Sequence, residues 1–308
     1  MLKKHRGEFY LVMGAITFSF NGVIAAIVLS HMSAFRLAQI RTIGAALFLI
    51  CYALARKPEI LRIERREIPQ FILYGVVGFA FVNGGYLLGI ERKLPLGFVL
   101  ILEYTAPIWI ALWIKYVRKG FVARDMWIAI LLSLVGLVLV ARVWDGFTFD
   151  LLGTAGALGS SVALAAYFLM GEKITVQRSA LGSAILGLSF AAIFWAVALP
   201  LWQFPTEVLS MSMNLQGHLA SFSAPGWSLI LYIIIAGTIV PYLFVIAGLR
   251  LLSASKSSVI GMLEPVLAGV FAWLWLGQGW DVIQLAGAAI VLVGIYLADK
   301  SKSATPAH

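Results

Sequence analysis

Charged residues are scarce in this 308-residue chain, where Asp, Glu, Lys and Arg together make up 12% of the sequence. A soluble globular domain carries about 25% of charged residues. Hydrophobic residues reach 61%, and the mean hydropathy is +0.95. This composition excludes a soluble globular protein and predicts an all-α integral membrane protein. Since a spanning helix needs ~20 mostly apolar residues, little of the chain is left for a soluble domain.

Residues that hold metals, nucleotides or disulfides are also scarce. Cys51 is the only cysteine, which excludes an internal disulfide and a cysteine-based metal cluster. The four histidines, at positions 5, 31, 218 and 308, show no ligand spacing. The sequence contains no Walker-type phosphate loop and no recognisable Ser-His-Asp arrangement. We therefore expect no cofactor, no metal and no enzymatic activity.

Long apolar runs fill the chain and predict ten transmembrane helices. We expect these helices at residues 9–29, 34–55, 68–90, 95–117, 125–143, 150–171, 179–201, 226–247, 256–276 and 281–298. Most of the connections between them are short. The exception is the polar, Ser- and Met-rich segment 202–225, for which a short interfacial helix is one possibility.

The basic residues are distributed unevenly over the predicted loops. If the N-terminus is cytoplasmic, five basic residues fall at the outer ends of helices, and the other 18 of the 23 fall inside. The five outer residues are Arg36, Arg41, Arg92, Lys93 and Arg142. Because Lys and Arg concentrate in cytoplasmic loops, this bias predicts cytoplasmic N- and C-termini and explains the net charge of +9 without a nucleic-acid partner.

Three blocks of sequence recur in the same order at nearly constant spacing. The blocks GFAFVNGGYLLG (78–89), FVLILEYTAPIWIALW (98–113) and LVGLVLV (134–140) align with GTIVPYLFVIAG (237–248), VIGMLEPVLAGVFAWL (259–274) and LVGIYLA (292–298). This alignment predicts two five-helix repeats, 1–145 and 146–308. Because each repeat has an odd number of helices, the second has inverted topology, as in many secondary transporters.

The ten spans, the inverted repeat and the stretch LEPVLAGVFAWLWLGQ (263–278) resemble the EamA family of the drug/metabolite transporter superfamily. Within that family the chain looks most like the YddG-type exporters of aromatic amino acids. The resemblance implies export of small metabolites across the bacterial inner membrane by alternating access. Members commonly end their fourth and ninth helices with Gly-Glu. This chain has Gly277-Gln278 after the ninth helix and KYVRKG (115–120) after the fourth, so no role of that acid carries over.

Two acids, Glu103 and Glu264, lie deep in the predicted fourth and ninth helices and align with each other in the repeat. Burying a charge in lipid costs at least ~2.5 kcal/mol, so both acids should face protein or water. They either line a central cavity and bind a substrate ammonium or a proton, or accept hydrogen bonds that hold the repeat together.

Prolines occur inside three predicted helices, at Pro107, Pro241 and Pro265. Each removes a backbone donor and bends its helix. Transporters place substrates at broken helices near the middle of the membrane. We therefore predict hinges at these prolines, with static packing kinks as the alternative.

Polar and aromatic residues at matching depths complete a candidate substrate cavity. Its predicted members are Asn21, Gln39, Phe79, Asn83, Tyr86, Glu103, Ser160, Tyr167, Thr238, Tyr242 and Glu264. For each Tyr, packing or a place in the interfacial belt is the alternative. Arg36 and Arg41, near the outer end of the second helix, fit headgroup anchoring better than attraction of a substrate carboxylate or a gate formed with an acid.

The function predicted from these features is secondary export of aromatic and other neutral amino acids by a monomer surrounded by membrane lipid. The first alternative is export of hydrophobic cations or other small metabolites, with Glu103 or Glu264 as the cation site. The second is a membrane-embedded lipid-modifying enzyme, which would need clustered His, Asp or Arg at one membrane face. Proton coupling and facilitated diffusion both remain open.

Overall fold

The computed structural model describes residues 5–142, 144, 150–277 and 279–301. Within these residues, ten helices are long and apolar enough to cross a membrane. These helices, spans 1 to 10, are Arg6–Leu29, Ala34–Arg56, Ile68–Glu91, Gly97–Val117, Arg124–Ala141, Leu151–Gln177, Ala180–Ala198, Gly226–Leu249, Ala254–Leu276 and Val282–Lys300. The number of spans is as predicted, and the sixth span extends six residues beyond its predicted end. The predicted boundary between the repeats, at 145 and 146, and Gln278 both lie outside the described residues.

An even number of spans brings the beginning of span 1 and the end of span 10 to the same end of the bundle, which we call the terminal end. The opposite end carries a two-stranded antiparallel hairpin, β1 (Ser212–Asn214) with β2 (Ser223–Pro225), and we call it the hairpin end. The segment 202–225 also contains the four-residue helix α10 (Glu207–Ser210). The predicted interfacial helix is therefore short, and the hairpin was not predicted.

Six spans are single α-helices with defined starts. They are α1 (Arg6–Leu29), α2 (Ala34–Arg56), α7 (Arg124–Ala141), α8 (Leu151–Gln177), α9 (Ala180–Ala198) and α15 (Val282–Lys300). Side-chain oxygens of Ser33, Asp150, Ser179 and Asp281 accept hydrogen bonds from backbone N–H groups in the first turns of α2, α8, α9 and α15. These caps satisfy donors that a helix start would otherwise leave unpaired.

Spans 3 and 8 each contain a π-helical turn at the same position of the repeat. Span 3 consists of α3 (Ile68–Gly75), the turn Val76–Phe81 and α4 (Val82–Glu91). Span 8 consists of α11 (Gly226–Ile234), the turn Ile235–Ile239 and α12 (Val240–Leu249). The two turns begin 159 residues apart, which is the offset of the first aligned block. Such turns widen a helix locally and are frequent at functional sites.

Spans 4 and 9 are broken where the sequence places an acid and a proline. Span 4 divides into α5 (Leu96–Glu103) and α6 (Ala106–Leu112), followed by the π-helical turn Trp113–Val117. Span 9 divides into α13 (Ala254–Gly261) and α14 (Leu263–Leu276). A proline cannot donate to the carbonyl four residues earlier, and its ring clashes with that carbonyl. For Pro107 and Pro265, the residues four positions earlier are Glu103 and Gly261, at which α5 and α13 end.

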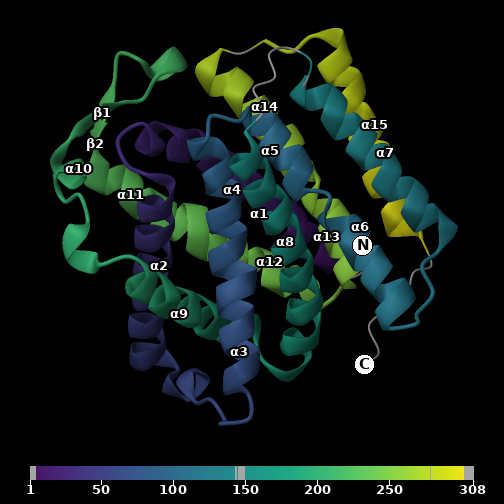
Figure 1. Ribbon diagram of the computed structural model, residues 1–308, viewed down its shortest axis with the longest axis horizontal. Coiled ribbons are helices and arrows are strands. Elements are labelled where there is room, and N and C mark those ends of the chain that lie inside the picture. The colour runs from purple at the N-terminus through teal and green to yellow at the C-terminus, as the bar shows by residue number, and fades with distance from the viewer. Residues whose placement is uncertain (1–4, 143, 145–149, 278, 302–308) are drawn as a thin grey trace.

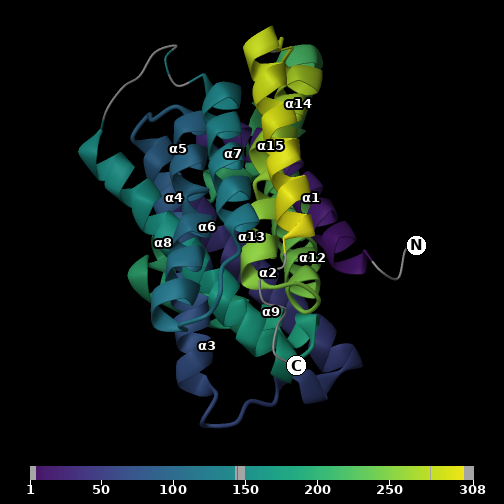
Figure 2. The same cartoon turned by 90° about the vertical axis from the view of Figure 1, so that its right-hand side faces the viewer.

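Two groups of helices form the bundle. Helices α7 and α15 lie side by side at one edge of the molecule (Figures 1 and 2). They approach so closely that a Cβ atom on Gly136 would meet the backbone of Gly287. The largest buried core lies in the other group, where α2, α3, α8 and α9 pack around Tyr74, Phe79 and Tyr167.

Candidate functional site

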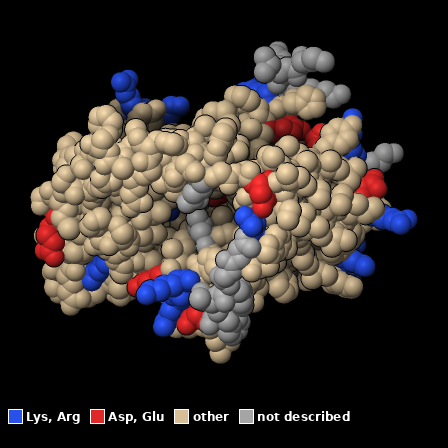
Figure 3. Space-filling view, turned by 90° about the horizontal axis from the view of Figure 1, so that it is seen from above, with Lys and Arg blue, Asp and Glu red and all other residues tan. Residues whose placement is uncertain are grey.

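A cavity of about 450 Å³ lies between spans 1, 2, 3, 4, 6, 8 and 9. Its wall is largely apolar and extends to Leu29, Ile90 and Leu276, which lie close to the hairpin end. Viewed from above, charged side chains of both signs lie mainly around the rim of the surface, which is hollowed near its centre (Figure 3). Leu11 and Ser257, near the starts of spans 1 and 9, also line the cavity, so it extends along most of the bundle from near the terminal end to the hairpin end.

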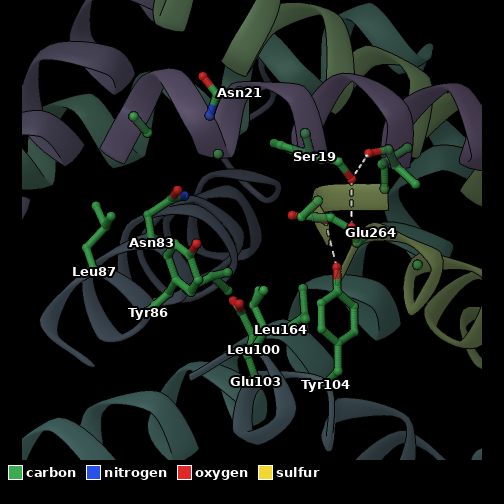
Figure 4. A pocket seen from close by; sticks show the side chains of 18 of the residues that line it. Ser19, Asn21, Asn83, Tyr86, Leu87, Leu100, Glu103, Tyr104, Leu164 and Glu264 are labelled. Atoms are coloured by element: carbon green, nitrogen blue, oxygen red, sulfur yellow. Dashed lines mark hydrogen bonds between the residues drawn. The ribbon is translucent and has the colours of Figure 1, made fainter. Parts of the chain in front are cut away.

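Most of the polar residues predicted for this cavity lie in its wall. The wall contains Asn21, Asn83, Tyr86, Glu103, Tyr167, Tyr242 and Glu264. Figure 4 shows Asn21, Asn83, Tyr86, Glu103 and Glu264 arranged around one space, although they come from four different spans. Glu103 is the last residue of α5, and Glu264 lies in the first turn of α14. The breaks in spans 4 and 9 therefore place both acids beside this space.

Gln39 and Phe79 lie outside the cavity wall, contrary to prediction. The Gln39 amide is buried against α9, where its Nε2 donates to the carbonyls of Trp195 and Leu199 at 3.1 and 2.7 Å. The Phe79 ring is fully buried and packs on Tyr242, with ring centroids 4.6 Å apart. Both residues were predicted from their depth in the spans, but neighbouring spans cover both side chains.

Ser160 and Thr238 are also absent from the cavity wall. The Ser160 hydroxyl donates to the Ala157 carbonyl at 3.0 Å, and the residue borders a separate groove on the other side of α4 and α8. The Thr238 hydroxyl donates to the Ile233 carbonyl at 2.7 Å, across the π-helical turn. Thr238 instead supports a residue that does reach the cavity.

That residue is Arg41, for which headgroup anchoring was the favoured interpretation. Its side chain is 6% exposed and lines the cavity. Arg41 Nε donates to Thr238 Oγ1 at 3.0 Å, and Nη2 donates to the Gly237 carbonyl at 2.8 Å. Because Pro241 has no N–H to donate to Gly237, that carbonyl is available to the guanidinium. Arg41 lies seven residues after the start of span 2. This depth was the signal in the sequence that its side chain reaches inward.

Arg36 lies at the hairpin end, as an anchor would. Its Nη1 donates to the Pro200 carbonyl and to Gln39 Oε1, both at 2.9 Å. The two arginines of α2 therefore have different surroundings, and only Arg41 is part of the cavity.

The two acids of the cavity are held differently. Tyr104 Oη donates to Glu264 Oε2 at 2.7 Å, and the Ser19 hydroxyl lies 2.8 Å from the Glu264 backbone oxygen (Figure 4). Glu103 is 8% exposed and forms no ion pair with any described Lys or Arg. Tyr104 was missed by the sequence reasoning, although it occupies the position that Pro265 has in the second repeat.

Aromatic rings close the bundle on the terminal side of Asn83. The rings of Tyr74 and Tyr167 stack with centroids 5.4 Å apart and an interplanar angle of 7°. Phe79 contacts both of them edge-on, at 5.1 and 5.3 Å. All three side chains are buried, so they close the cavity on the side of spans 3 and 6.

Ion pairs at the terminal end reinforce this closure. Arg178, after α8, donates from Nε and Nη2 to both carboxylate oxygens of Glu67, before α3, at 2.9 and 2.5 Å. The Arg178 guanidinium lowers the pKa of Glu67 from its usual value to about 2. Glu172 accepts from Arg118 at 2.7 Å and from the backbone N–H of Ala254 at 2.9 Å. These contacts join the ends of spans 3, 4, 6 and 9.

The whole arrangement is that of a membrane transporter: ten spans, two broken helices and a largely apolar central cavity that contains an arginine and two acids. The EamA-like transporter family model matches residues 5–142 and 151–298, so the chain belongs to this family. Members of this family and the similar proteins below are transporters, not enzymes. The chain is therefore a multi-pass inner-membrane transporter of a small molecule.

Several transporters are similar to this chain over most of its length. The uncharacterized transporter YdfC of Bacillus subtilis is 25% identical over 92% of this chain and 87% of its own. The uncharacterized inner membrane transporter YicL of Salmonella typhimurium is 23% identical over 95% and 94%. The threonine/homoserine exporter RhtA of Escherichia coli is 28% identical over 77% and 72%.

The fold also matches a solved crystal structure. The two chains superpose with a TM-score of 0.75 over 95% of this chain and 96% of the other, at 15% sequence identity. At this identity the likeness shows the fold alone. Together with the family match, it supports an all-α membrane protein with ten spans.

Proposed function

We propose that this transporter exports amino acids, aromatic and other neutral ones, across the inner membrane by alternating access. One observation carries the proposal: a guanidinium and two carboxyl groups, from Arg41, Glu103 and Glu264, line one largely apolar cavity. An α-amino acid presents one carboxylate, one ammonium and a side chain. This set of groups complements all three parts.

The substrate carboxylate is assigned to Arg41. Its Nε and Nη2 already donate to Thr238 and Gly237, so the guanidinium is fixed in orientation. Nη1 has no hydrogen-bond acceptor among the described residues. Charge-assisted hydrogen bonds from arginine to a carboxylate are short and strong, particularly in a site shielded from water.

The remaining wall suits a neutral side chain. The cavity volume of about 450 Å³ lies within the range of about 300–1,000 Å³ typical of small-molecule sites. Phe18, Tyr86, Leu100, Leu164 and Phe168 contribute apolar or aromatic surface. The RhtA relative, named as a threonine/homoserine exporter, supports amino acids as the substrate class.

We infer the membrane orientation from the uneven distribution of basic residues, which favours the terminal end on the cytoplasmic side. The cavity would then face outward, with Tyr74, Phe79 and Tyr167 closing the side of spans 3 and 6. Labelling with a membrane-impermeant thiol reagent tests this assignment. In a Cys51→Ser background, Ser223→Cys should be labelled in intact cells, and Glu59→Cys only after the cells are permeabilised.

Export of hydrophobic cations is the alternative, because Glu103 has no cationic partner among the described residues. Arg41 argues against it, since a fixed positive charge in the same cavity repels a substrate that lacks a carboxylate. We expect a monomer to be the transporting unit.

Uptake by proteoliposomes tests the proposed function. The purified protein should mediate saturable flux of one or more neutral amino acids, and the corresponding decarboxylated amines should compete poorly. A reversed preference, for amines over amino acids, would establish the cation exporter instead. Repeating the assay with and without a pH gradient separates proton exchange from facilitated diffusion.

A further inference from the structure

The two acids of the cavity occupy equivalent positions in the repeat, but the residues that follow them differ. Tyr104 follows Glu103, whereas Pro265 follows Glu264. The Tyr104 hydroxyl crosses from the first repeat to the second and donates to Glu264 at 2.7 Å. Pro265 has no polar side chain, so the symmetric hydrogen bond to Glu103 cannot form. The sequence difference therefore makes a nearly symmetric pair of acids unequal.

Glu264 already has partners within the protein. Tyr104 binds its carboxyl group, the Ser19 hydroxyl approaches its backbone oxygen, and Arg41 is the cation that acts on it electrostatically. These partners come from spans 4, 1 and 2, and they fix the start of α14 just after the break in span 9. Glu264 is therefore held in place before any substrate arrives.

Glu103 has no such set of partners. The Ser160 hydroxyl and the Glu264 carboxyl group act on it, and it forms no ion pair with a described Lys or Arg. Figure 4 shows its carboxyl end directed into the cavity, toward the side on which Asn83 and Tyr86 lie. A buried carboxylate without a cation is costly. A substrate ammonium, which has three donors, supplies the missing charge.

We propose that Glu103 binds the ammonium group of the substrate, and that Glu264 is a positioning residue, held by Tyr104 so that the broken ends of spans 4 and 9 stay in register. This assignment rests on the proposed function, since it requires a substrate with an ammonium group. Because Glu103 and Glu264 are equivalent positions of the repeat, symmetry alone would give both acids the same role. The assignment gives ammonium binding to Glu103 and positioning to Glu264.

Competition by paired ligands tests the assignment. The labelled substrate is the amino acid with the highest flux in proteoliposomes, and the competitors are that amino acid and its des-amino carboxylic acid. In the unmodified protein the amino acid should compete at least tenfold better. Glu103→Gln should remove this preference, whereas Glu103→Asp should keep most of it.

Variants of the other pair give the contrasting result. Glu264→Gln and Tyr104→Phe should keep the tenfold preference and lower the maximal rate instead. If both act through one hydrogen bond, the double variant should be no slower than the slower single variant, because the effects of directly coupled residues are not additive. Thermal unfolding in detergent confirms that each variant is folded before its preference is read, and Tyr104→Phe replaces Glu264→Gln if the latter does not fold.

The outcomes separate this assignment from the proposed function. Loss of the preference in Glu264→Gln together with its retention in Glu103→Gln would overturn the assignment, and so would equal losses in both. Absence of any amino-acid flux in the unmodified protein would overturn the proposed function, and the assignment with it.

Discussion

Asn83 Nδ2 donates to the Tyr242 hydroxyl at 2.9 Å, and these two residues are equivalent positions of the inverted repeat, 159 residues apart. Two equivalent residues can touch only where the axis relating the repeats passes between them. This hydrogen bond therefore marks the axis at the wall of the cavity, since both residues line it. Glu103 and Glu264, another equivalent pair, line the same space.

Removing the Asn83 side-chain amide should destabilise the junction of the two repeats. Asn83 Nδ2 also donates to the Phe79 carbonyl at 2.7 Å, so Asn83→Leu removes two buried hydrogen bonds. Each unsatisfied buried group costs about 1–3 kcal/mol. We expect thermal unfolding in detergent at a clearly lower temperature. Tyr242→Phe removes only the hydroxyl and should have a smaller effect; an equal or larger effect would contradict this account.

Neutralising Arg41 should weaken amino-acid binding more than it affects folding. Arg41→Gln should raise KM for amino-acid flux at least tenfold, which corresponds to ~1.4 kcal/mol. Arg41→Lys keeps the charge but not the fork of donors that joins Thr238 and Gly237, so an intermediate KM is expected. Competition by a decarboxylated amine should strengthen in Arg41→Gln, because the repelling charge is gone. An unchanged KM in Arg41→Gln would remove Arg41 from the substrate site.

The fold could be predicted from the sequence because its causes are local. Apolar runs of sufficient length produced all ten spans, and prolines one to four residues after the two acids indicated where spans 4 and 9 break. The π-helical turns Val76–Phe81 and Ile235–Ile239 were not predicted. Nothing in their composition distinguishes them from ordinary helix, since they depend on how neighbouring spans pack.

The cavity wall could be predicted only in part, because helical spacing gives a face of a helix but not what covers it. Gln39 and Phe79 lie on polar or aromatic faces, yet α9 covers Gln39, and the Tyr242 ring packs on Phe79. Arg41 faces inward because a carbonyl in span 8 accepts its hydrogen bond. Such contacts between spans that are distant in the chain cannot be predicted from a single sequence.

The contact between α7 and α15 should not tolerate a side chain at Gly136. A Cβ there would lie 2.6 Å from the Gly287 carbonyl, and a Cβ on Gly287 would lie 2.7 Å from the Gly136 carbonyl. Small residues of this kind allow membrane helices to approach closely. Gly136→Val should therefore lower the yield of folded protein in size-exclusion chromatography. Gly159→Val is the matched control, because no atom lies within 4 Å of a Cβ at Gly159; similar losses in both would refute the packing argument.

The ion pair between Glu67 and Arg178 should give the protein a stability that depends on pH. The pKa of Glu67 is lowered to about 2 in the folded protein, chiefly by the hydrogen bonds from Arg178, and is about 4.3 in an unfolded chain. A lowered carboxyl pKa stabilises the fold above the unfolded value, and this stabilisation is lost as the pH falls from about 4.3 toward 2.

Glu67→Gln should therefore lower the unfolding temperature in detergent at pH 7, and the difference from the unmodified protein should shrink between pH 5 and pH 3. Glu59→Gln, which changes an exposed acid in the same loop, should leave the unfolding temperature unchanged at every pH.

The same ion pair joins spans 3 and 6 at the closed end. In a Cys51→Ser background, Glu67→Gln should therefore increase the labelling, from the terminal end, of a cysteine placed at Ser257. A deficit in unfolding temperature that is the same at pH 7 and pH 3 would show that the charge of Glu67 is not the cause.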